Sequence, residues 1–266
     1  MRITRYDLTT SKPNIRFKAA VVADLHDMDY SEVLPILERE SADMIFIPGD
    51  LTESLDLINS NKPRLGLEFL KRITSVAPTF YSFGNHEVGA CHKNLRHAST
   101  LYPNRIAVLP EWREMILSTG ATLLDEDYVV YNDLAIGGLG SGLLNPRRVP
   151  KYQWIEKFAS NDCYKILLCH QPEYFDRYLR PYDIDLFVSG HAHGGQWRIF
   201  GRGVYAPDQS LFPKYTSGVH ENRLVISRGV SNSARPIPRF FNPREVVIIT
   251  VQVSKYYSAQ AVEGGI

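Results

Sequence analysis

The stretch FKAAVVADLH, residues 17–26, shows the pattern on which the whole chain is built. Its first seven residues are apolar apart from Lys18, and a short apolar run of this kind is typical of a buried β-strand. The run ends in Asp24 and His26, whose side chains carry oxygen and nitrogen donors. In an open α/β sheet, ligands bind beyond the carboxyl ends of the strands. A functional site is therefore expected where such strands end.

Similar strands and helical patterns alternate along the rest of the sequence. Further strands are predicted at 43–49, 79–84, 165–169, 185–189, 223–228 and 245–253, with extended segments near 128–139. Helices are predicted at 31–40 with Ser31 as N-cap, at 63–73 with Pro63 in the first turn, near 111–118, at 152–159 and at 172–179. This alternation favours an α/β fold, and the strand-rich C-terminal part indicates a second sheet in a layered sandwich. Because no repeat or linker-like shift in composition interrupts it, we expect one domain over residues 1–266.

Composition excludes several classes of protein. The 266 residues are 44% hydrophobic and 11% aromatic, which is enough for a sizeable core. Thirty Lys and Arg face 29 Asp and Glu, so no overall basic character predicts a nucleic-acid partner. Cys91, Cys163 and Cys169 form no C-x-x-C pair, which favours a reducing compartment over a disulfide framework. Since neither a signal peptide nor a spanning apolar run is visible, we expect a cytoplasmic protein without a membrane span or an obligate protein partner.

Five predicted strands are each followed by residues whose side chains carry oxygen or nitrogen donors. Beyond Asp24 and His26, the donors that follow the later strands are Asp50, then Asn85, His86 and Glu87, then His170, and finally His191 and His193. Each one alone is an ordinary turn residue. Their recurrence at one edge of a sheet predicts a metal site, because oxygen and imidazole donors suit divalent first-row metals.

The order D-x-H, G-D, G-N-H-E, H and G-H-x-H, from Asp24 to His193, resembles the calcineurin-like metallophosphoesterase family. The resemblance implies a four-layer α/β/β/α sandwich, in which two mixed sheets are flanked by helices and the metal site lies at the C-terminal edge of the strands. It also implies two divalent ions with separate ligands: Asp24, His26 and His193 for one, and Asn85, His170 and His191 for the other. Asp50 would bridge both ions. Gly190, Gly194 and Gly195 would let the backbone pass close to them. Manganese, zinc and iron all accept such ligands.

The implied activity is hydrolysis of a phosphate ester: a phosphodiester, a phosphomonoester or a pyrophosphate in a small anionic substrate. Two ions about 3.5–4 Å apart can share a hydroxide that attacks phosphorus in line. His86 is not needed as a ligand, which suits it to stabilise the transition state and protonate the leaving oxygen as general acid. In phosphatase members of the family, an Asp three residues after the bridging Asp orients this histidine. Here that position is Glu53, whose side chain is one methylene longer.

Two alternatives are compatible with the sequence. A nuclease of the same fold would normally have a broader basic groove, and the near-neutral composition argues against one. A non-catalytic metal-binding scaffold is also compatible with the fold, since function resides in the site. A decayed site should have lost ligands, however, and all seven are present.

The C-terminal segment, residues 196–245, carries eight Lys or Arg against three acids, interleaved with aromatic residues. It is either a solvated face over a partly buried aromatic cluster or a rim that binds the anionic substrate. For the rim we select Arg228 and Arg235, because guanidinium groups suit phosphate oxygens. The combination of GHAHGGQ, SRG and RFFNPRE resembles a bacterial branch that includes membrane-associated phosphodiesterases and a UDP-diacylglucosamine hydrolase. The usual amino-terminal anchor of that branch is not seen in this sequence, which weakens the expectation of a lipid substrate.

Overall fold

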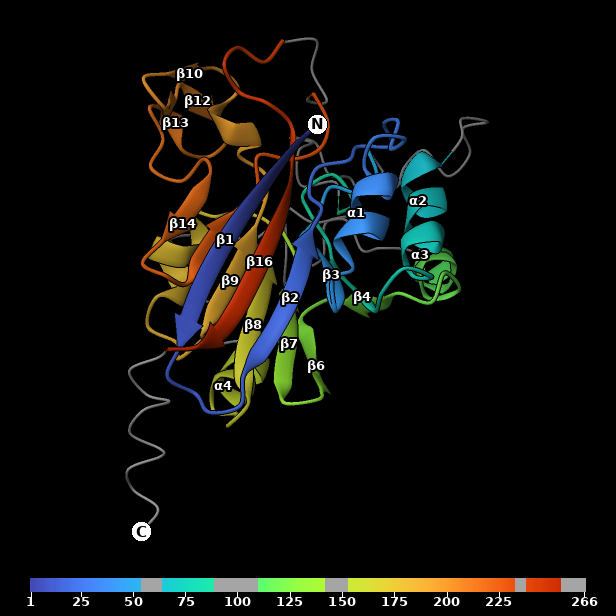
Figure 1. Ribbon diagram of the computed structural model, residues 1–266, viewed down its shortest axis with the longest axis vertical. Coiled ribbons are helices and arrows are strands. Elements are labelled where there is room, and N and C mark those ends of the chain that lie inside the picture. The colour runs from blue at the N-terminus through green and yellow to red at the C-terminus, as the bar shows by residue number, and fades with distance from the viewer. Residues whose placement is uncertain (54–63, 89–109, 142–152, 233–237, 255–266) are drawn as a thin grey trace.

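The protein has four layers, with two facing β-sheets between two layers of helices (Figure 1). The computed structural model describes residues 1–53, 64–88, 110–141, 153–232 and 238–254. The predicted α/β/β/α sandwich with two mixed sheets is confirmed. That residues 1–266 form a single domain stays a prediction.

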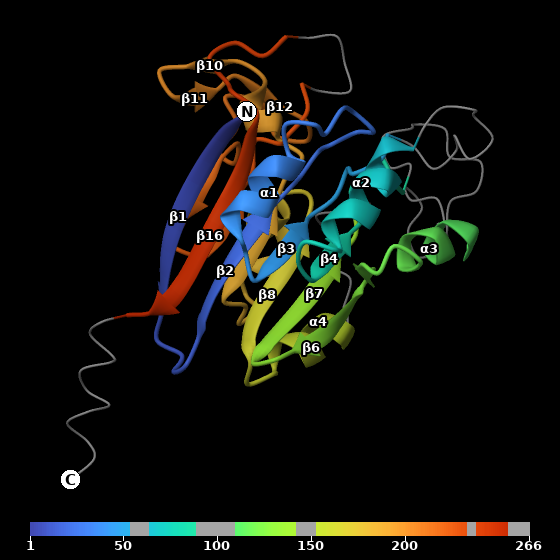
Figure 2. The ribbon, with the colours of Figure 1, turned by 45° about the vertical axis from the view of Figure 1, so that its right-hand side comes forward.

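The first sheet contains six strands within the described residues. In spatial order they are β1 (Arg2–Thr10), β16 (Glu245–Val253), β2 (Arg16–Val21), β3 (Met44–Ile47), β4 (Thr79–Ser82) and β5 (Thr122–Leu124). The strands β2 to β5 are parallel, so their carboxyl ends meet at one edge, whereas β16 is antiparallel to β2. The outer face is covered by α1 (Leu34–Glu40), α2 (Leu65–Ile73) and α3 (Pro110–Leu117), as Figure 2 shows.

The second sheet also contains six described strands. Their order is β14 (Gly218–His220), β15 (Leu224–Ile226), β9 (Leu186–Ser189), β8 (Tyr164–Cys169), β7 (Leu134–Leu139) and β6 (Asp127–Tyr131). The four central strands are parallel, and the two edge strands are antiparallel to their neighbours. The helix α4 (Gln153–Ala159) and the π-helical turn η2 (Phe175–Leu179) cover the outer face.

Alternation of side chains along β16 explains the layering. Val247, Ile249 and Val251 pack in the core between the sheets, whereas Val246 and Ile248 pack beneath the helices of the first sheet. Because successive side chains of a strand point to opposite faces, an uninterrupted apolar strand must be covered on both sides. The apolar runs in the sequence therefore specify buried strands between layers.

A small lobe of short strands extends from the carboxyl end of β9, at the top of Figure 1. It consists of the 3-10 turn η3 (His193–Gly195), β10 (Arg198–Ile199), β11 (Arg202–Gly203), β12 (Tyr205–Ala206) and β13 (Ser210–Leu211). These strands form two separate antiparallel pairs outside the main sheets. The chain then returns to β14 and β15.

Several local expectations need correction. The edge strand β1 was not predicted, because its apolar residues are separated by charged ones and it pairs with the distant β16. Ser31 is not an N-cap: its hydroxyl donates to Asp29 Oδ2 at 2.6 Å, and α1 begins after Val33 without a side-chain cap. Of the helix predicted at 172–179, only the turn η2 forms, and Pro63 lies outside the described residues. No helix of the described chain is long and apolar enough to cross a membrane.

Candidate metal centre

The predicted donors come together where strands of the two sheets end. Asp24 and His26 follow β2, Asp50 follows β3 and Asn85 follows β4, while His170 follows β8 and the His191–His193 pair follows β9. Many of these residues hold a left-handed backbone, which non-glycine residues seldom adopt and which clusters at functional sites. Those with positive φ are Asp24, His26, Asp50, His191 and His193. The backbone is therefore held in uncommon conformations where the donors converge.

Glycines allow the strand-end loops to approach closely. At Gly49, where φ is 120°, an added Cβ would lie 2.6 Å from Gly84 Cα and from the ring of His170. At Gly190 it would lie 2.8 Å from Asp24 Oδ2. Either contact is closer than packed atoms tolerate, so a side chain at these positions would push donors apart.

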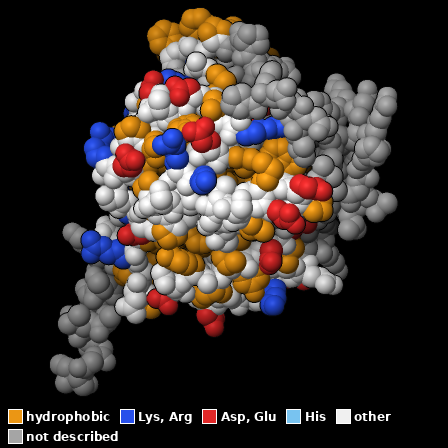
Figure 3. All heavy atoms as spheres, turned by 90° about the vertical axis from the view of Figure 1, so that its right-hand side faces the viewer, with side chains coloured by type: hydrophobic (Ala, Val, Ile, Leu, Met, Phe, Trp, Pro, Cys, Tyr) orange, Lys and Arg blue, Asp and Glu red, His pale blue; other side chains and the backbone are white. Residues whose placement is uncertain are grey.

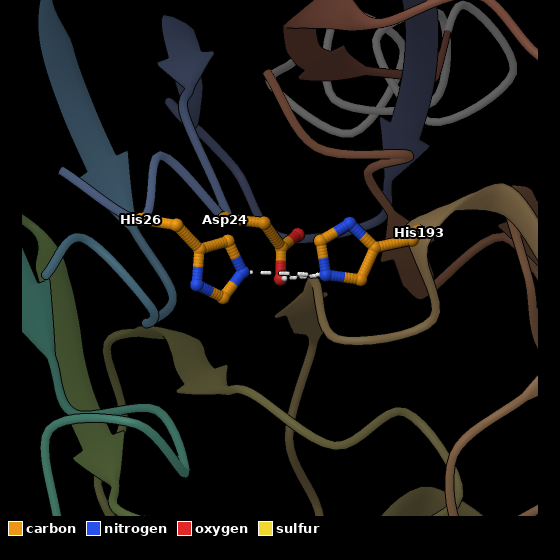
Figure 4. A group of neighbouring side chains, drawn as sticks. All are labelled: Asp24, His26 and His193. Atoms are coloured by element: carbon orange, nitrogen blue, oxygen red, sulfur yellow. Dashed lines mark hydrogen bonds and ion pairs between the residues drawn. The ribbon is translucent and has the colours of Figure 1, made fainter. Parts of the chain in front are cut away.

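One cluster contains Asp24, His26 and His193, each with a donor atom within 4.8 Å of the others. The Nε2 atoms of His26 and His193 are 3.3 Å apart, and His193 Nε2 is 3.7 Å from Asp24 Oδ1 (Figure 4). Asp24 is fully buried, and its Oδ2 has no hydrogen-bond partner among the described residues. Burial raises the pKa of Asp24. A buried carboxylate between two imidazole nitrogens is a donor set that a divalent cation fits.

A second cluster contains Asp50, His170 and His191. His170 Nε2 lies 3.0 Å from Asp50 Oδ2, 3.2 Å from His191 Nδ1 and 3.1 Å from Asn85 Oδ1. Burial would lower the pKa of His170, but the neighbouring Asp50 and Asp24 carboxylates raise it to about 9. Burial opposes ionisation of Asp50, yet the facing histidines hold the pKa of its carboxyl well below the usual range.

Asp50 also joins the second cluster to the first. Its Oδ2 lies 3.7 Å from His26 Nε2, and a further group of donors within mutual reach is formed by His26, Asp50 and His86. The two histidines of G-H-x-H face different clusters, because His191 contacts His170 whereas His193 contacts His26.

His86 lies beside these clusters and contacts Glu53. Its Nδ1 is 2.9 Å from the Glu53 carbonyl oxygen and 3.5 Å from Glu53 Oε1. Glu53 Oε2 lies 3.0 Å from Nδ1 of His26, so the same carboxylate contacts both imidazoles. Burial would raise the pKa of Glu53, but its hydrogen bonds with the two histidines lower it to about 2.

Glu87 was counted among the strand-end donors but was given no place among the predicted metal ligands or catalytic residues. Its buried carboxylate accepts hydrogen bonds from the Tyr81 hydroxyl and from the backbone N–H groups of Gly84, Asp50, Leu51 and Thr52, at 2.6–3.1 Å. It thus ties the loop after β3 to the loop after β4. Its position directly after His86 was the only sequence indication.

The C-terminal arginines are placed differently from one another. Arg228 is mostly buried, with its Nε 3.8 Å from Glu245 Oε2, and Arg235 lies outside the described residues. Arg239, which the sequence did not single out, donates to the Arg228 carbonyl at 2.7 Å and lies 3.2 Å from His193 Nδ1. Burial lowers the pKa of Arg239 to about 10. Its sequence indications were the basic character of the segment and its place at the start of RFFNPRE.

The lobe beyond η3 exposes many large apolar side chains. They include Trp197, Ile199, Phe200, Tyr205, Leu211 and Phe212, and the later residues Phe240 and Phe241 are exposed as well. Hydrophobic side chains gather at the top of the molecule in Figure 3, at the end where Figure 1 shows β10 to β13. Tyr215 is buried beneath the lobe, so the aromatic residues of this segment are partly core and partly surface.

A layered α/β sandwich brings carboxylate, amide and imidazole donors from five strand ends together, a donor set that suits divalent metal ions. The model of the calcineurin-like phosphoesterase family matches residues 17–195, and the chain belongs to this family.

Curated relatives match most of the chain. The chain is 24% identical to the uncharacterized metallophosphoesterase YkuE of Bacillus subtilis over 89% of its length and 79% of the relative. It is 28% identical to the uncharacterized metallophosphoesterase Cj0846 of Campylobacter jejuni over 87% of its length, but spans only 56% of that protein. It is 26% identical to the phosphodiesterase YaeI of Escherichia coli, over 86% of this chain and 81% of the relative.

Replacing Glu87 by Gln should destabilise the protein by about 1–3 kcal/mol, because the amide nitrogen would face buried N–H donors that then lack an acceptor. Urea denaturation measures the change. Glu38→Gln, on the exposed side of α1, is the matched control and should leave the free energy of unfolding nearly unchanged. Equal urea midpoints for the two variants would contradict the proposed role of Glu87 in holding the two loops together.

Proposed function

We propose that the protein is a hydrolase of phosphate esters that depends on two divalent metal ions. The observation that carries this proposal is the position of Asp50, whose carboxylate is within reach of both donor clusters. The family to which the chain belongs supports a phosphate-containing substrate. The phosphodiesterase name of the relative YaeI favours a phosphodiester among the candidates. Manganese, zinc and iron all suit this set of oxygen and imidazole donors.

In this proposal each ion has its own ligands, and Asp50 serves both. The ligands are Asp24, His26 and His193 for the first ion, and Asn85, His170 and His191 for the second. Two histidines are placed so that the tautomer which ligation needs would be stabilised. His170 Nδ1 lies 3.1 Å from the Pro48 carbonyl and His26 Nδ1 lies 3.0 Å from Glu53, so in the neutral rings an N–H at each Nδ1 would leave Nε2 with a free lone pair for a metal ion.

Bound divalent ions would polarise the phosphoryl oxygens and lower the pKa of an attacking water. The protein's own contribution would be the placement of His86. With Nδ1–H donated to the Glu53 carbonyl, its Nε2 is left to hold a proton for the leaving oxygen. The Glu53 carboxylate lies 3.5 Å from the same Nδ1. Glu53 also contacts His26, a proposed ligand of the first ion. We therefore propose that Glu53 orients both the general acid His86 and this ligand.

The activity is tested by a screen of the metal-reconstituted protein against phosphomonoesters, phosphodiesters and nucleotide sugars. We expect hydrolysis in at least one class with manganese, zinc or iron. Inactivity on all three classes with every metal would overturn the hydrolase proposal.

The metal stoichiometry gives a second test, independent of substrate. Protein loaded with manganese or zinc and then desalted should retain close to two equivalents by elemental analysis. Asp50→Asn should lose more metal than Asp24→Asn, because both ions depend on Asp50 and only one on Asp24. A stoichiometry of zero in the wild-type protein after loading would rule out the dinuclear centre.

His86→Asn should lower kcat by roughly 10²–10⁴-fold on a substrate with a poor leaving group, the range for loss of a general acid. The loss should shrink on an activated aryl phosphate, whose leaving oxygen hardly needs a proton, and the metal content should not change. His220→Asn, on the edge strand β14, is the matched control. If His86→Asn removes the metals instead, His86 is a ligand and its proposed role is wrong.

Arg228 and Arg235 remain our proposed substrate-binding residues. Changing either to Ala should raise KM with metal content intact, and Lys should not restore it fully because an ammonium lacks the planar guanidinium fork. Arg228 also faces the buried Glu245, so the melting temperature of the Arg228→Ala protein must be measured together with its kinetics. A lower melting temperature with unchanged KM for both variants would leave them a structural role only.

A further inference from the structure

His191 has contacts on both of its ring nitrogens. Its Nδ1 lies 3.2 Å from His170 Nε2, on the side of the second donor cluster. Its Nε2 lies 3.3 Å from Asp208 Oδ2. A neutral imidazole carries one N–H, so a ring that ligates through Nδ1 must hold its proton on Nε2. The proton then points at the Asp208 carboxylate.

Asp208 reaches this position from the C-terminal lobe, not from a strand end of the main sheets. It lies in the turn between β12 and β13, with a left-handed φ of 58°. The turn is fastened on two sides: the Asp208 carbonyl accepts from Arg177 Nη2 at 2.8 Å, and the Gln209 side chain bonds to both the N–H and the carbonyl of Tyr215. These bonds fix the turn, and the turn places the Asp208 carboxylate next to Nε2 of His191.

Glu173 is a second carboxylate at the same place. Glu173, His191 and Asp208 each have a donor atom within 4.8 Å of the other two. Glu173 is only 5% exposed, and neither of its carboxylate oxygens has a hydrogen-bond partner among the described residues. A buried carboxyl group without a partner is costly, so a neighbouring N–H that carries partial positive charge is favourable there.

We propose that Asp208 is a positioning residue for His191, and that Glu173 reinforces it from the buried side. By accepting the Nε2 proton, Asp208 fixes the tautomer and the ring orientation in which Nδ1 faces the second metal ion. The inference rests on the proposed dinuclear centre. A carboxylate behind a ligating histidine also increases its basicity, and removal of such a partner typically weakens metal binding about 10–100-fold.

A third metal ion among the same three residues is the competing arrangement. It would need His191 to bind ions through both nitrogens, and hence to lose both ring protons. A hydrogen bond to Asp208 needs no such ionisation and agrees with the Nε2 to Oδ2 distance of 3.3 Å. The third-ion arrangement is separated from ours by stoichiometry.

The test is a Mn²⁺ titration of metal-stripped protein, followed by calorimetry and by electron paramagnetic resonance. Wild-type protein should bind two equivalents and give the spectrum of a coupled Mn²⁺ pair. Asp208→Asn should weaken one site about 10–100-fold and leave the other unchanged, so that one equivalent gives the spectrum of isolated Mn²⁺. Asp208→Glu should recover part of the loss, and Glu173→Gln should act in the same direction with a smaller effect.

A second measurement distinguishes positioning from a structural role. In zinc-loaded protein with ¹⁵N-labelled histidine, the His191 proton should reside on Nε2, and Asp208→Asn should give a mixture of tautomers. The control is Glu221→Gln, which removes an exposed carboxylate of the same C-terminal segment that pairs with Arg180. It should change neither the affinity nor the tautomer.

The possible failures are distinguishable. If the wild-type protein does not bind a second equivalent, the proposed dinuclear centre is wrong. If it binds two and Asp208→Asn leaves both affinities and the tautomer unchanged, Asp208 has no positioning role, even where its melting temperature falls. A third equivalent that disappears in Glu173→Gln would make the carboxylates metal ligands and overturn our inference.

Discussion

The Glu87 carboxylate is the interaction on which the arrangement of the centre depends. It is buried between two loops from neighbouring strands and accepts five hydrogen bonds, four of them from backbone N–H groups. Hydrogen bonds to a charged acceptor are stronger than neutral ones, and here they replace the water that burial removes. Because one of the donors is the N–H of Asp50, the same carboxylate that holds the loops together also fixes the backbone of the residue that contacts both His26 and His170.

This arrangement places several carboxylates in the interior, and the neighbouring histidines reduce the free-energy cost of burying their charges. Asp24, Asp50 and Glu87 are all at most 1% exposed and lie within one small region. The pKa of Glu87 is raised first by burial and then by the charge of Asp50, while the histidines around Asp50 hold the pKa of that carboxyl low. Bound cations would stabilise the same acids further, since a ligand that binds only the folded state adds to its stability. The buried carboxylates that affect the stability of the fold are thus the same groups that would bind the metal ions.

The sequence was sufficient to predict the strands that carry the centre and most of the residues that meet there. Apolar runs such as 17–23 and 185–189 specify strands buried on both faces, and their parallel arrangement brings their carboxyl ends to one edge. It was insufficient for β1, whose apolar residues alternate with charged ones and whose partner β16 is more than 200 residues away. Asp208, Glu173 and Arg239 were missed for a related reason. Asp208 and Glu173 lie in none of the quoted motifs, and RFFNPRE contains Arg239 without indicating its contacts. All these contacts form only when distant loops fold back over the strand ends.

The sequence by itself determined which donor types follow which strand, because apolar periodicity and the residues that interrupt it are local properties of the chain. Only the tertiary structure decided how those donors face one another. His26 contacts Glu53 across 27 residues of sequence and His193 across 167, and each contact involves a different ring nitrogen. Which nitrogen faces a cluster and which faces a carboxylate depends on the packing of two sheets and on the path of their connecting loops. These distances of a few ångströms are set by contacts between layers, and no local pattern encodes them.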